Sequence, residues 1–124
     1  MFIHSTGQIG SPLLNLGSVR VDVMNKVEET TQIVSILFFN TATSPKTLVS
    51  QDTFSIPPSS GASRTFTPPI FPNNYEIVVR TNNQRVIPYI TGIDALGLNL
   101  NPSVTFKYGD LFVYEIPGTI GLGN

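Results

Sequence analysis

Hydrophobic and polar residues alternate along much of the chain with the period of β-strands. In residues 18–27 (SVRVDVMNKV), three valines alternate with Arg20, Asp22 and Met24. Successive side chains of a strand point to opposite faces, so this segment is predicted to be a strand with one buried face. Residues 31–40 (TQIVSILFFN) are apolar without alternation. Such a run is typical of a strand covered on both faces or flanked by a subunit contact.

Six further segments have the residue types and lengths of strands, and no long segment shows a helical period. These segments are 48–56, 64–67, 75–81, 85–91, 104–108 and 111–116. Ten glycines and ten prolines punctuate the chain, and residues 92–103 are expected to form a Gly/Asn-rich loop.

Three short signals predict how neighbouring strands connect. Asn82-Asn83-Gln84 suggests a tight hairpin between the strands on either side. Pro88 lacks a backbone donor, so its strand is expected to lie at an edge or to carry a bulge there. Gly109-Asp110 fits either a two-residue hairpin or a bulge within one long strand.

Seven or eight short strands separated by turns predict an all-β fold, a single antiparallel β-sandwich. A jelly roll is the preferred variant and an immunoglobulin-like sandwich the alternative. The 124 residues suffice for one hydrophobic core. The side chains expected to be buried in it are Val21, Ile36, Phe38, Ile77, Val79, Phe106 and Phe112.

The N-terminal segment, residues 1–17, is too apolar for a solvated tail and too broken by glycine and proline for an amphipathic helix. It is either the first strand of its own sandwich or an extended arm that adds to a neighbouring subunit. We favour the arm, which divides the chain into a connector, 1–17, and a β-sandwich domain, 18–124, with Gly17 as the hinge. The residues expected at the subunit interface are Phe2, Ile3, Ile9, Leu13, Leu14, Leu16 and Gly17.

Charge is scarce. Only 12% of the residues are charged and the net charge is −1, whereas about a quarter is usual in soluble domains. A chain with this charge has no positive surface potential to attract nucleic acid. No apolar run reaches the roughly 18–20 residues needed to cross a membrane. A surface with so little charge suggests contacts with copies of the same chain. The segment MFIHSTGQ lacks the features of a secretory signal, so either the chain is made inside a cell without one or a signal was removed before residue 1. We favour the first and expect the chain to be made in the cytoplasm.

The inventory of reactive side chains argues against catalysis. The chain has no cysteine and one histidine, His4. Thiol catalysis, thiolate zinc sites, disulfides and multi-histidine metal sites are therefore excluded. A Ser-His-Asp arrangement needs a histidine on a rigid scaffold, and because His4 lies so near the terminus we expect it to be a polar interruption of the arm instead of a base. We expect no enzyme, no cofactor and no small-molecule substrate. Whether a calcium ion sits near Asp94 or Asp110 stays open, because the intervening loop is rich in asparagine but lacks D-x-D-x-D spacing.

Carboxylates and tyrosines have two interpretations each. Eight acidic residues provide some pair in any sandwich, so a glycosidase-like pair is not indicated. The four tyrosines suit either a sugar-stacking face or ordinary core and cross-strand packing. They are Tyr75, Tyr89, Tyr108 and Tyr114.

The layout of an apolar N-terminal segment without a secretory signal, a glycine hinge and a low-charge sandwich resembles the endospore appendage fibre subunits of spore-forming bacteria. The resemblance covers residues 1–17 and 18–116. It implies jelly-roll subunits that stack into a homopolymeric fibre, with the connector of one subunit docked into the next, at the spore surface or outside the cell. Better-known members carry connector cysteines that cross-link the fibre. Since this chain has none, the resemblance implies a cysteine-free type held by strand addition and burial.

Two other classes share parts of this layout. A virion component, such as a capsid-decorating or tail protein, is also a low-charge sandwich with an apolar arm and no signal. A carbohydrate-binding module needs no arm and is expected to be monomeric.

Overall fold

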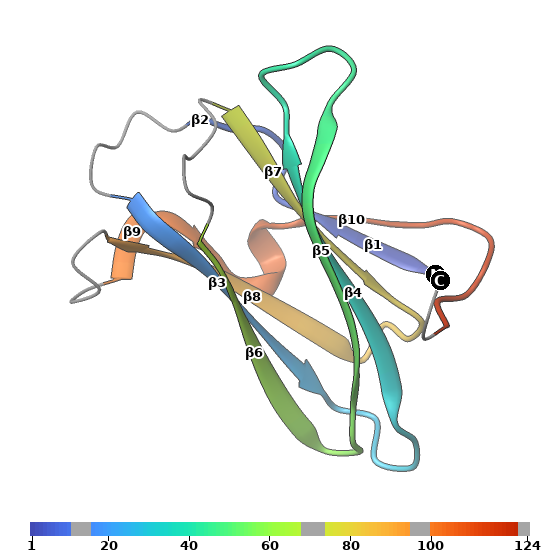
Figure 1. Ribbon diagram of the computed structural model, residues 1–124. Coiled ribbons are helices and arrows are strands. Elements are labelled where there is room, and N and C mark those ends of the chain that lie inside the picture. The colour runs from blue at the N-terminus through green and yellow to red at the C-terminus, as the bar shows by residue number, and fades with distance from the viewer. Residues whose placement is uncertain (11–15, 68–73, 95–99, 122–124) are drawn as a thin grey trace.

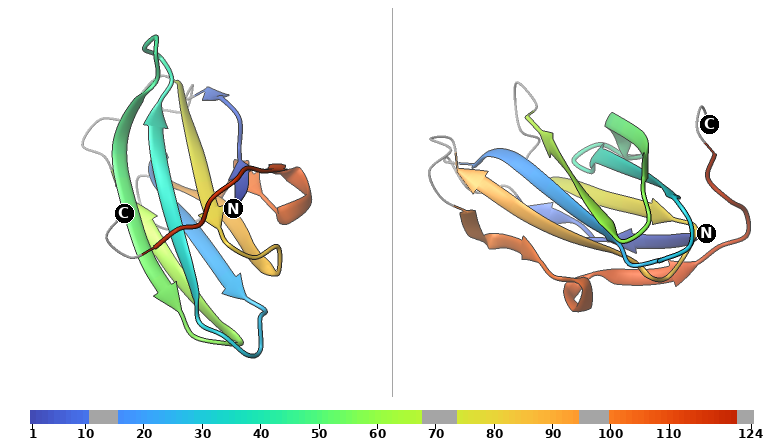
Figure 2. Two further views of the ribbon diagram at one scale, coloured as in Figure 1. Left: turned by 90° about the vertical axis from the view of Figure 1, so that its right-hand side faces the viewer. Right: turned by 90° about the horizontal axis from the view of Figure 1, so that it is seen from below.

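The computed structural model describes residues 1–10, 16–67, 74–94 and 100–121, which form two antiparallel sheets packed face to face (Figures 1 and 2). The first sheet has the order β10 (Phe112–Glu115), β1 (Phe2–Ser5), β7 (Asn74–Thr81), β4 (Gln32–Asn40) and β5 (Thr47–Ile56), and β2 (Ile9–Gly10) also pairs with β7. The second sheet has the order β6 (Ser60–Phe66), β3 (Leu16–Asn25), β8 (Val86–Asp94) and β9 (Leu100–Phe106).

The predicted all-β sandwich is confirmed. Each of the predicted strand segments overlaps a strand of the structure, which adds β1 and β2 at the N-terminus. Among the described strands, β4–β5 and β8–β9 are the consecutive pairs that hydrogen-bond to each other, and most other connections pass from one sheet to the other. Such crossing is typical of Greek-key sandwiches. No helix within these described ranges is long and apolar enough to cross a membrane.

The hairpin predicted at residues 82–84 is wrong, because β7 lies in the first sheet and β8 in the second. The turn is nevertheless well ordered by hydrogen bonds. The backbone N–H of Arg85 donates to Oδ1 of Asn83 (2.8 Å), and that of Val86 donates to the Asn83 carbonyl (3.1 Å). A local turn signal of this kind does not reveal whether the flanking strands pair or separate.

Both alternatives for Gly109-Asp110 are also wrong. The dipeptide belongs to a 3₁₀ turn, η1 (Tyr108–Asp110), which carries the chain from β9 in the second sheet to β10 in the first. The carboxylate of Asp110 accepts a hydrogen bond from the backbone N–H of Lys107 (3.1 Å). This local bond stabilises a turn that connects the sheets instead of pairing its own flanks.

The prediction for Pro88 is wrong, because its strand is neither an edge of the second sheet nor bulged at Pro88. β8 is central in the second sheet, but its pairing with β9 begins only at Ile90. Pro88 therefore has a strand neighbour on one side, Val23 of β3, where the missing donor is tolerated.

The core between the sheets contains most of the residues expected there. Val21, Ile36, Phe38, Ile77 and Val79 are fully buried, and Phe106 packs at the margin. The prediction for Phe112 is wrong, since 66% of it is exposed. Phe112 is opposite Ser5, which in turn is opposite Val78 on the outer face of the first sheet, so Phe112 points away from the second sheet.

β4 is apolar on both faces, as its continuous run predicted. Ile36 and Phe38 point into the core, whereas Leu37 is buried on the outer face of the first sheet. There it forms a second cluster with Ile3 and Val78. The N-terminal strand is thus part of what covers this face.

Candidate functional site

The N-terminal strand β1 lies between β7 and β10 in the first sheet of its own chain (Figure 1). Ile3 is opposite Arg80 on one side and Tyr114 on the other. Its side chain is 4% exposed and belongs to the outer cluster with Leu37. In the single chain, the described part of this segment is therefore a strand of its own sandwich, the first of the two interpretations above.

The other expected interface residues are dispersed. Phe2 is half-buried in β1, and Ile9 is buried in the main core. Leu16 begins β3, and Gly17 occupies an irregularity within that strand instead of a hinge before it. Leu13 and Leu14 lie outside the described residues. Contact between this segment and a neighbouring subunit stays a prediction.

Hydrogen bonds fix both ends of β1. The N-terminal ammonium group donates to the carbonyls of Ile116 and Gly118, each at 3.0 Å. The backbone N–H of Ile77 donates to the hydroxyl of Thr6 (3.1 Å), and the Thr6 N–H donates to the Ile77 carbonyl (3.1 Å). The Ser5 hydroxyl donates to the carboxylate of Glu76. Polar side chains thus hold this segment in place, in addition to the apolar residues noted in its sequence.

His4 is buried on the inner face of β1. Nε2 lies 3.3 Å from Oγ1 of Thr81, and the ring centroid lies 5.8 Å from that of Tyr108. Among the described residues, Nδ1 has no hydrogen-bond partner. Burial without a compensating charge lowers the pKa of His4 to about 4. The imidazole is consequently neutral at neutral pH, and it acts here as a packed core residue.

β10 is an exposed apolar edge strand. Among the described strands β1 is its only neighbour, so the N–H and C=O groups of its outer side face no strand. Phe112, Val113 and Tyr114 are 66%, 41% and 54% exposed. The strand carries a single charge, on Glu115. Edge strands are normally protected by charge, proline or a covering segment, and β10 has little of this protection.

The opposite edge of the same sheet has similar character. β5 is the last strand there, and Leu48 and Val49 near its start are 49% and 45% exposed. The nearest cation, Lys46, is held by Glu76 at 2.7 Å and lies over the ring of Phe39. Both edges of the first sheet therefore offer apolar side chains beside open backbone groups.

The acidic side chains do not assemble into a reactive centre in the described ranges. Asp22, Asp52, Glu76 and Glu29 each pair with an arginine or lysine instead of with one another. Within those same ranges no three His, Cys, Asp or Glu side chains lie close enough to hold a metal ion. Asp110 accepts the Lys107 N–H within its turn.

The tyrosines do not form one face. Tyr75 is buried in the core and stacks on Phe38, with ring centroids 5.3 Å apart. Tyr108 lies on η1, Tyr114 on β10 and Tyr89 on β8, in three different places of the fold.

No model of a known protein family matches the chain, and neither does any curated protein or solved structure.

Proposed function

We propose that this chain is a structural subunit that polymerises with copies of itself by adding strands at the edges of its first sheet. The observation that carries the proposal is β10, a backbone edge with three consecutive exposed apolar residues. A strand added there gains main-chain hydrogen bonds and covers Phe112 and Tyr114, which share one face. The resemblance of the sequence makes a bacterial spore-surface fibre the assembly we propose.

A second copy of the chain is the occupant that the charges favour. β10 contains one carboxylate, and the exposed part of β5 from Thr47 to Gln51 contains no charge. Like charges would keep copies apart, and these edges hardly have any. Both edges belong to one sheet, so each subunit has two places where another copy can join.

The strand directions suggest how copies meet. All neighbours in the first sheet are antiparallel, so β10 and β5, four steps apart, run in the same direction. A twofold axis at each edge would pair β10 with β10 and β5 with β5, antiparallel in both cases, which is the more stable pairing. Two such contacts alternating along a row generate an open-ended fibre.

The N-terminal strand supports this contact from inside the subunit. β1 is the only described strand that holds β10. Insertion of residues 2–10 into a neighbour would require β1 to leave its sheet and an identical strand to replace it. Such an exchange costs little at equilibrium because the contacts are the same. It is the second route to the same assembly.

Light scattering and electron microscopy test the proposal. We expect the purified chain to form fibres. Tyr114→Lys places like charges across the β10–β10 contact, and Leu48→Lys does the same at the β5–β5 contact. Each single variant should stop at dimers, and the double variant should be monomeric. Thr65→Lys, on the exposed face of β6, is the matched control and should assemble normally.

Other outcomes decide against the proposal. A native chain that stays monomeric at millimolar concentration, or lysine variants that assemble like the native chain, would overturn it. Closed shells or rings would favour a virion component instead.

A disulfide between Phe2→Cys and Glu115→Cys, which are paired in β1 and β10, locks β1 in its own chain. If the locked protein still forms fibres, strand exchange is not required.

A further inference from the structure

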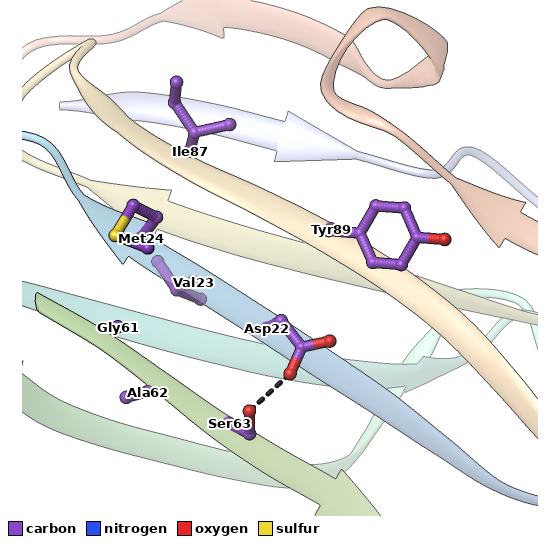
Figure 3. Close-up of a pocket in the computed structure, with 8 residues that line it drawn as sticks. All are labelled: Asp22, Val23, Met24, Gly61, Ala62, Ser63, Ile87 and Tyr89. Atoms are coloured by element: carbon purple, nitrogen blue, oxygen red, sulfur yellow. Dashed lines mark hydrogen bonds between the residues drawn. The ribbon is translucent and has the colours of Figure 1, made fainter.

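The outer face of the second sheet carries a hollow of about 490 Å³ (Figure 3). The edge strands β10 and β5 belong to the other sheet. The hollow is open to solvent and lies over β3, β6 and β8. Its floor and rim are formed by Asp22, Met24, Gly61, Ser63, Ile87 and Tyr89. Its size is within the range of roughly 300–1,000 Å³ that is common for small-molecule sites.

Strand register creates the hollow. On the outer face of β3, Asp22 is opposite Ser63 and Tyr89, and Met24 is opposite Gly61 and Ile87. Gly61 has no side chain, so the row through Met24 is low on one side. A Cβ at Gly61 would lie 3.5 Å from Cε of Met24 and from the Val23 carbonyl, an ordinary contact distance. Packing would therefore tolerate a side chain at Gly61, so the fold does not require the hollow.

Tyr89 provides a flat apolar platform. Figure 3 shows its ring face-on from the side of the hollow, with the hydroxyl directed away from Met24. The face of an aromatic ring carries partial negative charge. It attracts the weakly positive C–H groups that cover one side of a pyranose ring. Met24 and Ile87 extend this apolar surface along the strands.

A polar group lies beside the platform. Asp22 accepts hydrogen bonds from the Ser63 hydroxyl and from Nε of Arg20, the latter at 3.1 Å. These bonds hold the carboxylate in place and leave it partly exposed, and the Arg20 guanidinium is partly exposed as well. Planar acceptors and donors of this kind suit the hydroxyls of a sugar. Because Arg20 and Asp22 neutralise each other, the group favours an uncharged ligand.

We propose that this hollow binds a neutral carbohydrate, with one sugar ring stacked on Tyr89 and its hydroxyls bonded to Asp22 and Arg20. An apolar platform alone would suit many partners. Its combination with a preorganised, charge-balanced polar rim matches a ligand that has an apolar face and a hydroxyl edge. The site lies on the second sheet, so it does not depend on assembly through β10 and β5.

NMR titration with cellohexaose, chitohexaose and maltohexaose tests this site. It is carried out on the full chain with Tyr114→Lys and Leu48→Lys, because fibres of the native chain would give no resolved solution signals. We expect at least one of these oligosaccharides to shift the signals of the Met24 methyl group and the Tyr89 ring. Tyr89→Ala should weaken that binding at least tenfold, and Tyr89→Phe should retain it within about twofold. Gly61→Leu fills the hollow and should also weaken binding at least tenfold. Ser55→Leu, exposed on β5, is the matched control and should bind like the same chain without this substitution.

The outcomes separate this proposal from the assembly proposal. Isothermal titration calorimetry of the native chain with the same oligosaccharide should give the affinity of the Tyr114→Lys/Leu48→Lys variant, whether or not fibres form. The absence of any shift with all three oligosaccharides would overturn the inference, whether or not fibres form. Binding that neither Tyr89→Ala nor Gly61→Leu weakens would place the sugar elsewhere and would overturn it as well.

Discussion

Nε2 of His4 and Oγ1 of Thr81 lie 3.3 Å apart inside the sandwich, where they join the N-terminal strand to the end of β7. Both residues are fully buried. The neighbours of His4 across the sheet are Val79 and Val113, and the ring of Tyr108 faces it from η1. No carboxylate among these neighbours compensates a positive imidazolium.

Acid should therefore destabilise the fold through His4. Its pKa is about 4 in the folded chain against 6.5 when unfolded, so the unfolded chain binds the proton first as the pH falls. The stability from neutral His4 is complete above pH 6.5 and is lost progressively down to about pH 4. The expected loss in the free energy of unfolding is on the order of 3 kcal/mol.

Urea unfolding between pH 7.5 and 5 measures this effect, because the upper part of the range avoids most carboxylate titration. His4 is the only histidine, so His4→Gln should flatten the dependence of stability on pH above pH 5. An unchanged slope in that variant would contradict the assignment.

The buried side chain of Asn25 forms hydrogen bonds that connect the two sheets, and its replacement should lower the stability of the fold. Its Nδ2 lies 3.1 Å from each of the carbonyls of Thr30, Ile56 and Pro57, and its Oδ1 accepts the Val27 N–H at 2.9 Å. Asn25→Ala leaves these groups unsatisfied and should lower the free energy of unfolding by at least about 2 kcal/mol.

Asn40→Ala is the matched comparison for that measurement. The Asn40 side chain accepts one exposed hydrogen bond, from the Ala42 N–H, and its loss should cost less than about 1 kcal/mol. Equal effects in denaturant unfolding would show that burial of the Asn25 network is unimportant.

Gly7 should resist replacement for two separable reasons. Its φ of +68° is a conformation that favours glycine. A Cβ there would also lie 3.1 Å from Cε2 of Phe112. Gly7→Ala should therefore lower the melting temperature, with a loss of about 1–2 kcal/mol from the backbone conformation alone.

Two other glycines serve as controls in the same thermal unfolding experiment. Gly118 has a positive φ of +109° with no atom near its Cβ position, and Gly109 has free space and no positive φ. Alanine at Gly118 reports the backbone cost alone, and alanine at Gly109 should be close to neutral. In a Phe112→Ala background, the steric part of the destabilisation by Gly7→Ala should disappear, and the part due to the backbone conformation should remain. Equal melting temperatures for Gly7→Ala and Gly109→Ala would contradict this prediction.

The positions of strands could be predicted because their signals are local. The valines of β3 alternate with polar residues, and the apolar run of β4 is buried on both faces. A period of two places side chains on opposite faces whatever the rest of the chain does. Val21, Ile36 and Phe38 were therefore recognisable as core residues from the sequence alone.

Strand pairing, in contrast, was decided by tertiary structure. The turn at Asn83 is clear in the sequence, but whether it joins paired strands or opposite sheets depends on residues far along the chain. Phe112 looks like a core residue in its own segment, but it is exposed because register turns it to the outer face of the first sheet, on an edge strand. Apolar character predicts that a side chain favours burial, whereas topology determines which positions have a second layer to pack against.

The same division holds for the candidate sites. The sequence by itself determined an all-β sandwich with little charge and no thiol, and it pointed to an unusual N-terminal segment. Only the tertiary structure placed β1 between β7 and β10, and only register placed Asp22 beside Ser63 and Tyr89. Local patterns depend on neighbours a few residues away, while edges and hollows arise from contacts between distant segments, which no local pattern contains.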